Sequence, residues 1–142
     1  MTRFADRSRG DPVPLILVGM PRIPALVLAA DAVAVVVFAA IGRLSHAEPD
    51  DLLGLAATAA PFLLGLGASW LSPAVRDDPA SLRAGAVALA GTVVLGLLVR
   101  AGSTGSLPLS FAIVTTVSLA VLLLGWRGLS LAVARRAAQR VR

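Results

Sequence analysis

Four apolar runs, each close to twenty residues long, restrict the folds open to this chain. They cover approximately residues 24–41, 52–71, 82–99 and 109–126. A hydrocarbon core about 30 Å thick requires about 20 apolar residues per helix, and no run keeps the polar stripe that a helix of a soluble bundle shows. Hydrophobic residues make up 57% of the chain, against about 45–50% in soluble domains. The sequence predicts an all-α integral membrane protein, with a bundle of four transmembrane helices within residues 23–127.

Two polar tails flank this bundle. Residues 1–22 carry charges of both signs together with several prolines, so we expect a disordered tail, and Met20 is an alternative start to Met1. Residues 128–142 are basic and amphipathic, which is typical of a short helix on an anionic leaflet; a protein-binding tail is the alternative. The residues expected to contact lipid headgroups are Arg135, Arg136, Arg140 and Arg142.

The distribution of basic residues predicts the orientation. Of the 13 basic residues, only Arg43 and Arg100 fall in the loops that join the first run to the second and the third to the fourth. Cytoplasmic loops carry the excess of arginine, and tryptophan gathers at membrane interfaces; Trp70 and Trp126 lie at the arginine-rich ends. We therefore expect a multi-pass protein of the bacterial plasma membrane with both termini in the cytoplasm. A signal peptide cleaved after Ala47 is the alternative for the first run.

Several kinds of chemistry are excluded. The chain has no cysteine, which excludes disulfides, thiol chemistry and iron–sulfur ligation. His46, the one histidine, clusters with Glu48, Asp50 and Asp51 at a spacing that matches no metal motif. We expect a solvated loop whose acids balance Arg43 and Arg100. No catalytic constellation or nucleotide motif is present, so we expect no enzyme activity, no cofactor and no nucleic-acid partner.

Asp31 is the one acid inside an apolar run. A charged side chain within the membrane is costly and marks function or a buried partner. It could be a proton- or cation-binding carboxylate that faces the bundle. Alternatively, it could form a buried ion pair or a hydrogen bond at a helix end, with Arg83 or Arg22 as the expected partner.

Polar and small residues mark the other three runs. Pro61 predicts a kink in the second run, either as ordinary packing or as a hinge for alternating access. Thr115 and Ser118 share one face of the fourth run, where they could bond their own helix or line a polar path with Asp31. A helix face made of small residues lets helices approach closely in lipid. Such small faces are present on two runs: Gly54, Thr58, Pro61, Gly65 and Ser69 on the second, and Ala84, Ala88, Thr92 and Gly96 on the third.

A set of these residues resembles a known family. The set comprises Asp31, Gly42-Arg43 with His46, Arg100, Ser110-Phe111 and Gly125-Trp126-Arg127. Over about residues 24–128 the chain is similar to the small four-helix membrane proteins catalogued as domain of unknown function family 3054, met in actinobacteria and haloarchaea. The resemblance implies a fold and a membrane location, and no activity.

These observations favour a structural or accessory membrane component. Four helices enclose little beyond their own side chains, so the alternative is a small oligomeric transporter or channel that uses Asp31 and the kink at Pro61. An accessory subunit is expected to tolerate Asp31→Asn and to purify with a larger complex. A transporter is expected to lose flux on the same substitution.

Overall fold

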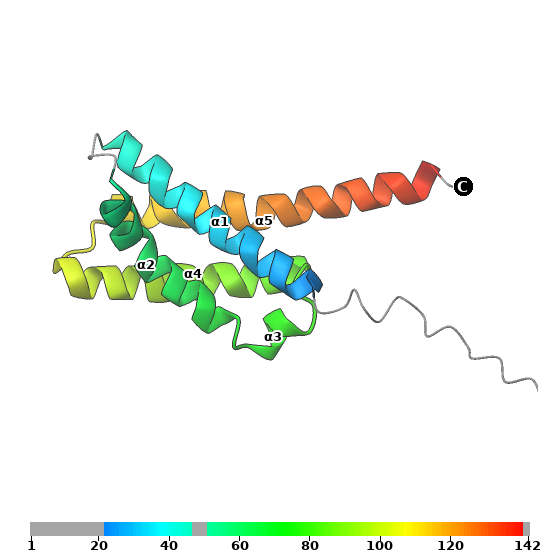
Figure 1. Cartoon of the computed structure of the whole chain (residues 1–142), viewed down its shortest axis with the longest axis horizontal. Coiled ribbons are helices and arrows are strands. Elements are labelled where there is room, and N and C mark those ends of the chain that lie inside the picture. Colours follow the sequence, from blue (N-terminus) through cyan, green and yellow to red (C-terminus); the bar gives the residue numbers. More distant parts are fainter. Residues whose placement is uncertain (1–21, 47–50, 141–142) are drawn as a thin grey trace, which may run out of the picture.

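The structure is a computed structural model that describes residues 22–46 and 51–140, and every described element is helical (Figure 1). The expectations for residues 1–21, Met20, Glu48, Asp50 and Arg142 lie outside the described residues. The elements are α1 (Arg22–Ser45), α2 (Leu52–Ser69), α3 (Pro73–Arg76), α4 (Leu82–Thr104) and α5 (Leu109–Arg140).

Four of the helices, α1, α2, α4 and α5, are long and apolar enough to cross a membrane. Only 17–33% of each apolar stretch is buried inside the bundle. Large contiguous apolar surface is rare on soluble monomers, so this much uncovered surface suits a lipid environment. The four helices agree with the four predicted runs and suggest a multi-pass membrane protein.

The bundle has two ends, which we name after the charged residues near them. At the Asp31 end lie the starts of α1 and α4, the end of α2 and the short helix α3 (Figure 1). At the Arg43 end lie the end of α1, the starts of α2 and α5, and the end of α4. Because the chain crosses the bundle four times, the first and last described residues lie toward the same end.

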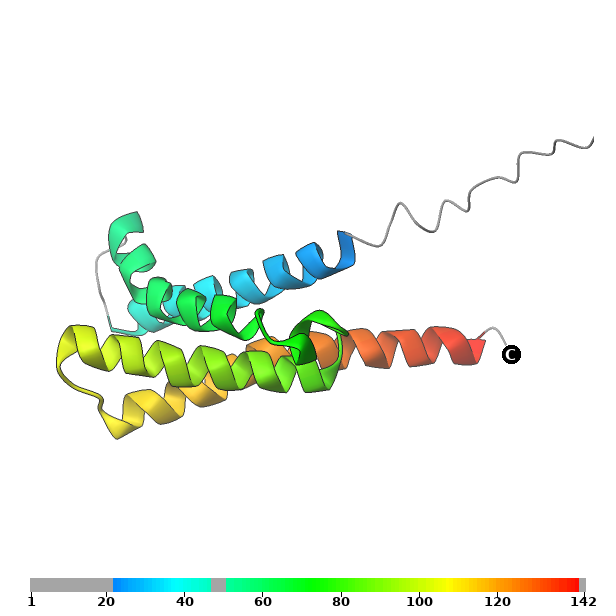
Figure 2. The same ribbon diagram turned by 90° about the horizontal axis from the view of Figure 1, so that it is seen from below.

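Three helices are longer than predicted: α1 extends beyond residues 24–41 at both ends, and α4 and α5 continue past their predicted last residues. We expected α4 to stop near residue 99, but it continues to Thr104, where Gly105 adopts a left-handed backbone conformation with φ 70° that glycine accepts without strain. We expected a separate tail after residue 127, but α5 runs unbroken to Arg140 and projects beyond the other helices (Figure 2). A glycine inside a helix costs only about 1 kcal/mol relative to alanine, so Gly125 and Gly128 do not end it.

Side-chain caps fix where α2 and α4 begin. Asp51 accepts a hydrogen bond from the Gly54 amide, and Ser81 accepts one of 3.1 Å from the Ala84 amide. Such caps satisfy amides that have no partner in the first helical turn. Asp51 is therefore the N-cap of α2.

The faces of small residues predicted on α2 and α4 pack against each other. A β-carbon built on Gly65 would lie 2.8 Å from the Gly91 carbonyl oxygen and 3.0 Å from the Thr92 Cα. A β-carbon on Gly96 would overlap the Phe62 ring. At Gly65 the two backbones therefore meet at a distance that only glycine permits.

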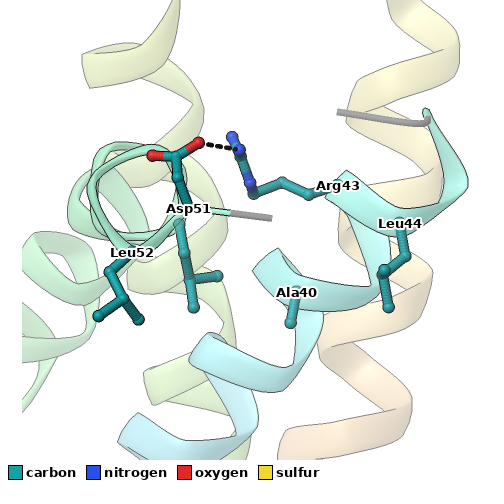
Figure 3. A pocket seen from close by; sticks show the side chains of 6 residues that line it. Ala40, Arg43, Leu44, Asp51 and Leu52 are labelled. Atoms are coloured by element: carbon teal, nitrogen blue, oxygen red, sulfur yellow. Dashed lines mark hydrogen bonds and ion pairs between the residues drawn. The ribbon is translucent and has the colours of Figure 1, made fainter. Parts of the chain in front are cut away.

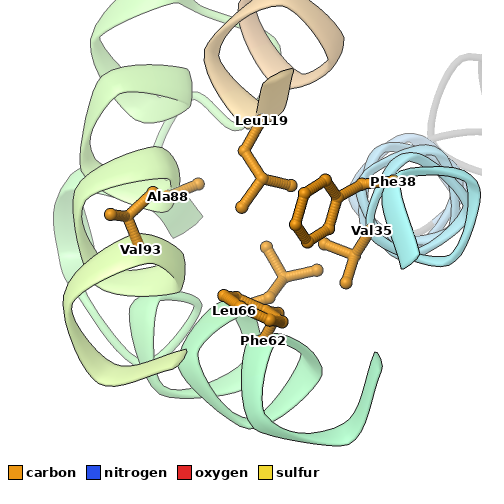
Figure 4. Close-up of a cluster of buried hydrophobic side chains, with 7 residues drawn as sticks. All are labelled: Val35, Phe38, Phe62, Leu66, Ala88, Val93 and Leu119. Carbon is orange, nitrogen blue, oxygen red and sulfur yellow. The ribbon is translucent and has the colours of Figure 1, made fainter. Parts of the chain in front are cut away.

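A compact apolar cluster joins all four long helices (Figure 4). Phe38 of α1 and Phe62 of α2 meet edge to face, with ring centroids 5.2 Å apart and an interplanar angle of 82°, an arrangement that aromatic pairs favour. Leu119 brings α5 into the same cluster. The remaining members are Val35, Leu66, Ala88 and Val93.

Pro61 lies inside α2 and is buried. Figure 2 shows the axis of α2 changing direction along its length, as a proline without an amide hydrogen allows. The bend agrees with the predicted kink, and Pro61 shares a helical face with Gly65, which packs on α4.

Candidate functional site

Asp31 forms a buried ion pair with Arg127, which joins α1 to α5. The Arg127 Nη1 lies 2.7 Å from the Asp31 Oδ1, and the Nη2 lies 2.8 Å from the Oδ2. Both side chains are 0% exposed. This parallel, two-bonded arrangement is the strongest and most directional form of an arginine–carboxylate contact.

Every N–H group of the Arg127 guanidinium has an acceptor. Besides the two bonds to Asp31, Nη1 donates to the Leu123 carbonyl at 2.9 Å. The Nε and Nη2 donate to the Pro79 carbonyl at 3.2 and 3.1 Å. Arginine carries five N–H groups, so none remains unsatisfied in the interior, and the loop between α3 and α4 is tied to α5.

Two neighbours complete what we call the Asp31 cluster, namely Asp31, Pro79, Gly85, Trp126 and Arg127. The Trp126 Nε1 donates to the Asp31 Oδ1 at 3.1 Å, and the Arg127 Cζ lies 4.5 Å from the centroid of the Trp126 ring. Gly85 of α4 leaves room for the arginine, since a β-carbon there would lie 2.7 Å from the Arg127 Cδ. The cluster therefore connects α1, α4, α5 and the loop before α4.

The predicted partners of Asp31 need correction. Arg83 is exposed at the start of α4 and does not reach Asp31, and the side chain of Arg22 lies outside the described residues. The partner is Arg127, which we had counted among the arginines of the loops because it directly follows the fourth apolar run. The one signal in the sequence is the Gly125-Trp126-Arg127 motif, which is part of the family resemblance.

At the Arg43 end, a second ion pair joins α1 to the start of α2 (Figure 3). The Arg43 Nη2 lies 3.0 Å from the Asp51 Oδ2, and the Arg43 side chain is 11% exposed. The guanidinium lies against Gly54, where a β-carbon would overlap it. Asp51 thus caps α2 with one oxygen and holds Arg43 with the other, which agrees with the expectation that loop acids balance Arg43.

Arg100 does not follow that expectation within the described residues. Its Cζ lies 4.5 Å above the centroid of the Phe111 ring, and it makes no ion pair with a described acid. His46 and Arg100 both line two hollows between α1, α4 and α5, and the inner hollow is also lined by Thr58 of α2. Within residues 22–46 and 51–140, no three His, Cys, Asp or Glu side chains could hold a metal ion together.

The hydroxyl groups of α5 divide into two kinds. The hydroxyl of the exposed Thr116 donates a hydrogen bond of 2.7 Å to the Ala112 carbonyl of its own helix. Bonding to the backbone of the same helix is the ordinary role of such hydroxyls. Thr115 is fully buried, lines the inner hollow and has a hydroxyl without a partner in the described structure. Ser118 is half-buried and does not line that hollow.

Comparison with known proteins identifies a family and no nearer relative. No curated protein and no solved structure matches the chain. A family model described as a protein of unknown function (DUF3054) matches residues 28–130, a range that includes Asp31, Arg100 and Arg127. This match covers more than half of the sequence and confirms the family that the sequence motifs resemble. The chain therefore belongs to the DUF3054 family.

Proposed function

We propose that this protein is a structural or accessory component of the bacterial plasma membrane, with both termini in the cytoplasm. The observation that supports this proposal is that Asp31 is buried and bonded to other side chains of the protein. The one acid of the apolar runs accepts three hydrogen bonds and is 0% exposed. A carboxylate held in this way joins helices and is not available to a passing ion.

The same contacts give less support to a transporter that works through Asp31 and Pro61. A carrier must expose its binding carboxylate in turn to each side of the membrane. Here, exposure of Asp31 would break its bonds to Arg127 and Trp126 and would leave the Arg127 charge buried without its partner, which is costly. Pro61 is also buried, which fits packing better than hinge motion.

The uncovered surface of α5 supports an accessory role. Only 17% of its apolar stretch is buried, and Leu109, Val117 and Val121 are exposed along it.

Arg135 lies about 12 Å beyond Arg127 along the axis of α5, at about 1.5 Å per residue. We propose that Arg135, Arg136 and Arg140, all exposed at the end of α5, lie at the depth of anionic headgroups and contact them.

The accessory role is tested with native membranes extracted in a mild detergent. The tagged full chain is purified, sized and analysed by mass spectrometry. We expect a larger membrane protein to purify with it, and the abundance of that protein should fall when the gene is deleted and return when the gene is restored. A homo-oligomer with no larger partner would contradict the proposal and favour transport. Asp31→Asn no longer separates the two functions, because it would disturb the fold in either case.

The orientation is tested by cysteine labelling, which suits a chain without cysteine. Ser106→Cys lies between α4 and α5 at the Arg43 end, and Asp78→Cys lies between α3 and α4 at the Asp31 end. In intact cells, a membrane-impermeant maleimide should label Ser106→Cys alone. Asp78→Cys should react only after the membrane is opened, and the reverse pattern would contradict the proposed orientation.

A further inference from the structure

Two connected hollows lie at the Arg43 end, between α1, α4 and α5. The wider one has a volume of about 440 Å³ and the inner one about 80 Å³. Both are lined by His46, Arg100, Phe111 and Val114, so the inner hollow continues the wider one toward the bundle interior. We call the two together the Arg100 pocket.

The Arg100 pocket is lined by positive groups. Arg100 makes no ion pair with a described residue, and its guanidinium is held in place by stacking on the Phe111 ring. Stacking occupies the flat face of a guanidinium and leaves the N–H groups at its edge able to donate. No described acid lines either hollow. Arg43 also borders the inner hollow but is engaged by Asp51, so the anion-binding group of this pocket is Arg100.

The inner end of the Arg100 pocket holds an unused hydrogen-bonding group. Thr115 lines it and is 0% exposed, and its hydroxyl has no partner in the described structure. Buried hydroxyls in native structures are almost always satisfied. An oxyanion accepts hydrogen bonds from both hydroxyl and guanidinium donors, so one ligand group would satisfy Thr115 and neutralise Arg100.

Most of the remaining lining of the inner hollow is apolar, whereas the wider hollow is also lined by the polar residues Thr104, Ser106 and Ser110. Phe38 and Ala39 of α1 and Phe111 and Val114 of α5 line the inner hollow, and Val114 is 61% exposed toward the outside of the bundle. Apolar walls that lead from a charged group to the outer surface of a membrane helix fit a hydrocarbon chain. A small hydrated anion would gain nothing from them.

We propose that the Arg100 pocket binds an amphipathic anion, with a phosphate or carboxylate head at Arg100 and Thr115 and an apolar chain along Phe111 and Val114. The head could belong to an anionic membrane lipid or to a free fatty acid. Both sources present the same chemistry to the pocket, and the choice of probes separates them.

The test uses the full chain in a neutral detergent, with an environment-sensitive fluorophore on Ser106→Cys at the rim of the wider hollow. The probes are dioctanoyl phosphatidylglycerol, decanoate, dioctanoylglycerol and inorganic phosphate. We expect saturable binding of phosphatidylglycerol if the source is lipid, or of decanoate if it is a fatty acid. Dioctanoylglycerol lacks the anion and phosphate lacks the chain, so each should bind at least tenfold more weakly. Equal binding of either would overturn the proposal.

Matched variants identify the pocket as the site of binding. Arg100→Gln should weaken binding at least tenfold, and Arg100→Lys should weaken it less. Arg83→Gln changes an exposed arginine at the opposite end of the same helix and should leave affinity unchanged. Thr115→Val should weaken binding severalfold without lowering the melting temperature, which separates loss of the ligand from loss of the fold. Binding by Arg100→Gln within twofold of the parent would overturn the assignment.

Discussion

Asp31 and Arg127 are separated by 96 positions in the sequence and form a two-bonded ion pair that no solvent reaches. The pair connects the first long helix to the last, and the arginine also binds the backbone of its own helix and of the loop before α4. Removal of two charges from water is costly, and the cost is recovered only when all the remaining hydrogen-bonding groups are satisfied. In the Asp31 cluster these groups are all satisfied. Loss of one member would leave the remaining buried charge or hydrogen-bonding groups without partners, and the protein would lose stability.

Loss of one charge of this pair should strongly destabilise the protein. Arg127→Gln leaves the Asp31 carboxylate buried without its partner, and Asp31→Asn leaves the guanidinium in the same state. We expect each substitution to lower the free energy of unfolding by about 3–5 kcal/mol, measured by denaturant titration in mild detergent.

The double variant Asp31→Asn/Arg127→Gln provides the control for this prediction. It carries no buried charge, so it should be more stable than the sum of the two single changes implies, by about 1–3 kcal/mol of coupling. Simple additivity would show that the two side chains do not interact as described. Arg83→Gln, at an exposed arginine, should change stability by less than about 0.5 kcal/mol.

Gly85 should also be sensitive to substitution, because it leaves the space that the Arg127 side chain occupies. In Gly85→Ala the new methyl group would lie 2.7 Å from the Arg127 Cδ, and that side chain cannot move aside because hydrogen bonds hold its far end. We expect a loss of about 1–3 kcal/mol. Gly102→Ala lies on the same helix with nothing within 4 Å and should be neutral or stabilising by up to about 1 kcal/mol. Equal thermal stability of the two variants would contradict this description of the cluster.

The sequence was sufficient to predict the helices and the faces of small residues on two of them. Length and apolar content alone define the four long helices, because a bilayer sets both quantities. The spacing of Gly65 and Ser69 on α2 and of Ala88 and Gly96 on α4 predicted two small faces, and close approach of helices in lipid requires such faces. Local periodicity carries this information, so no knowledge of the fold was needed.

The partner of Asp31 could not be predicted in the same way. Arg127 directly follows an apolar run, where an arginine usually contacts headgroups, and no spacing in the sequence relates it to a residue 96 positions away. Whether it turns inward depends on Gly85, which lies on a third helix and leaves the space. Arg83 and Arg127 both adjoin apolar runs, and only the packing of the helices distinguishes the exposed one from the buried one.

The α2–α4 interface provides a matched pair of glycines in one short segment. A β-carbon on Gly65 would meet backbone atoms of Gly91 and Thr92, whereas Gly67 has nothing within 4 Å. Because backbone atoms cannot rotate away, Gly65→Ala must push the helices apart, and we expect a loss of about 1–3 kcal/mol. Gly67→Ala should be neutral or stabilising by up to about 1 kcal/mol. Thermal melting of both variants measures the difference, and a similar loss in both would show that the close contact is not as described.

Thr115 and Thr116 provide a second matched pair, in which the buried residue should be the more dispensable for stability. The Thr115 hydroxyl is buried without a partner, and the Thr116 hydroxyl is exposed and bonded to its own helix. Valine has nearly the same shape as threonine, so Thr115→Val removes an unsatisfied polar group and should raise the free energy of unfolding by about 1 kcal/mol in protein freed of lipid. Thr116→Val should change it by less than about 0.5 kcal/mol. A clear loss of stability in Thr115→Val would mean that the hydroxyl bonds to the protein itself, and would leave the Arg100 pocket without its inner donor.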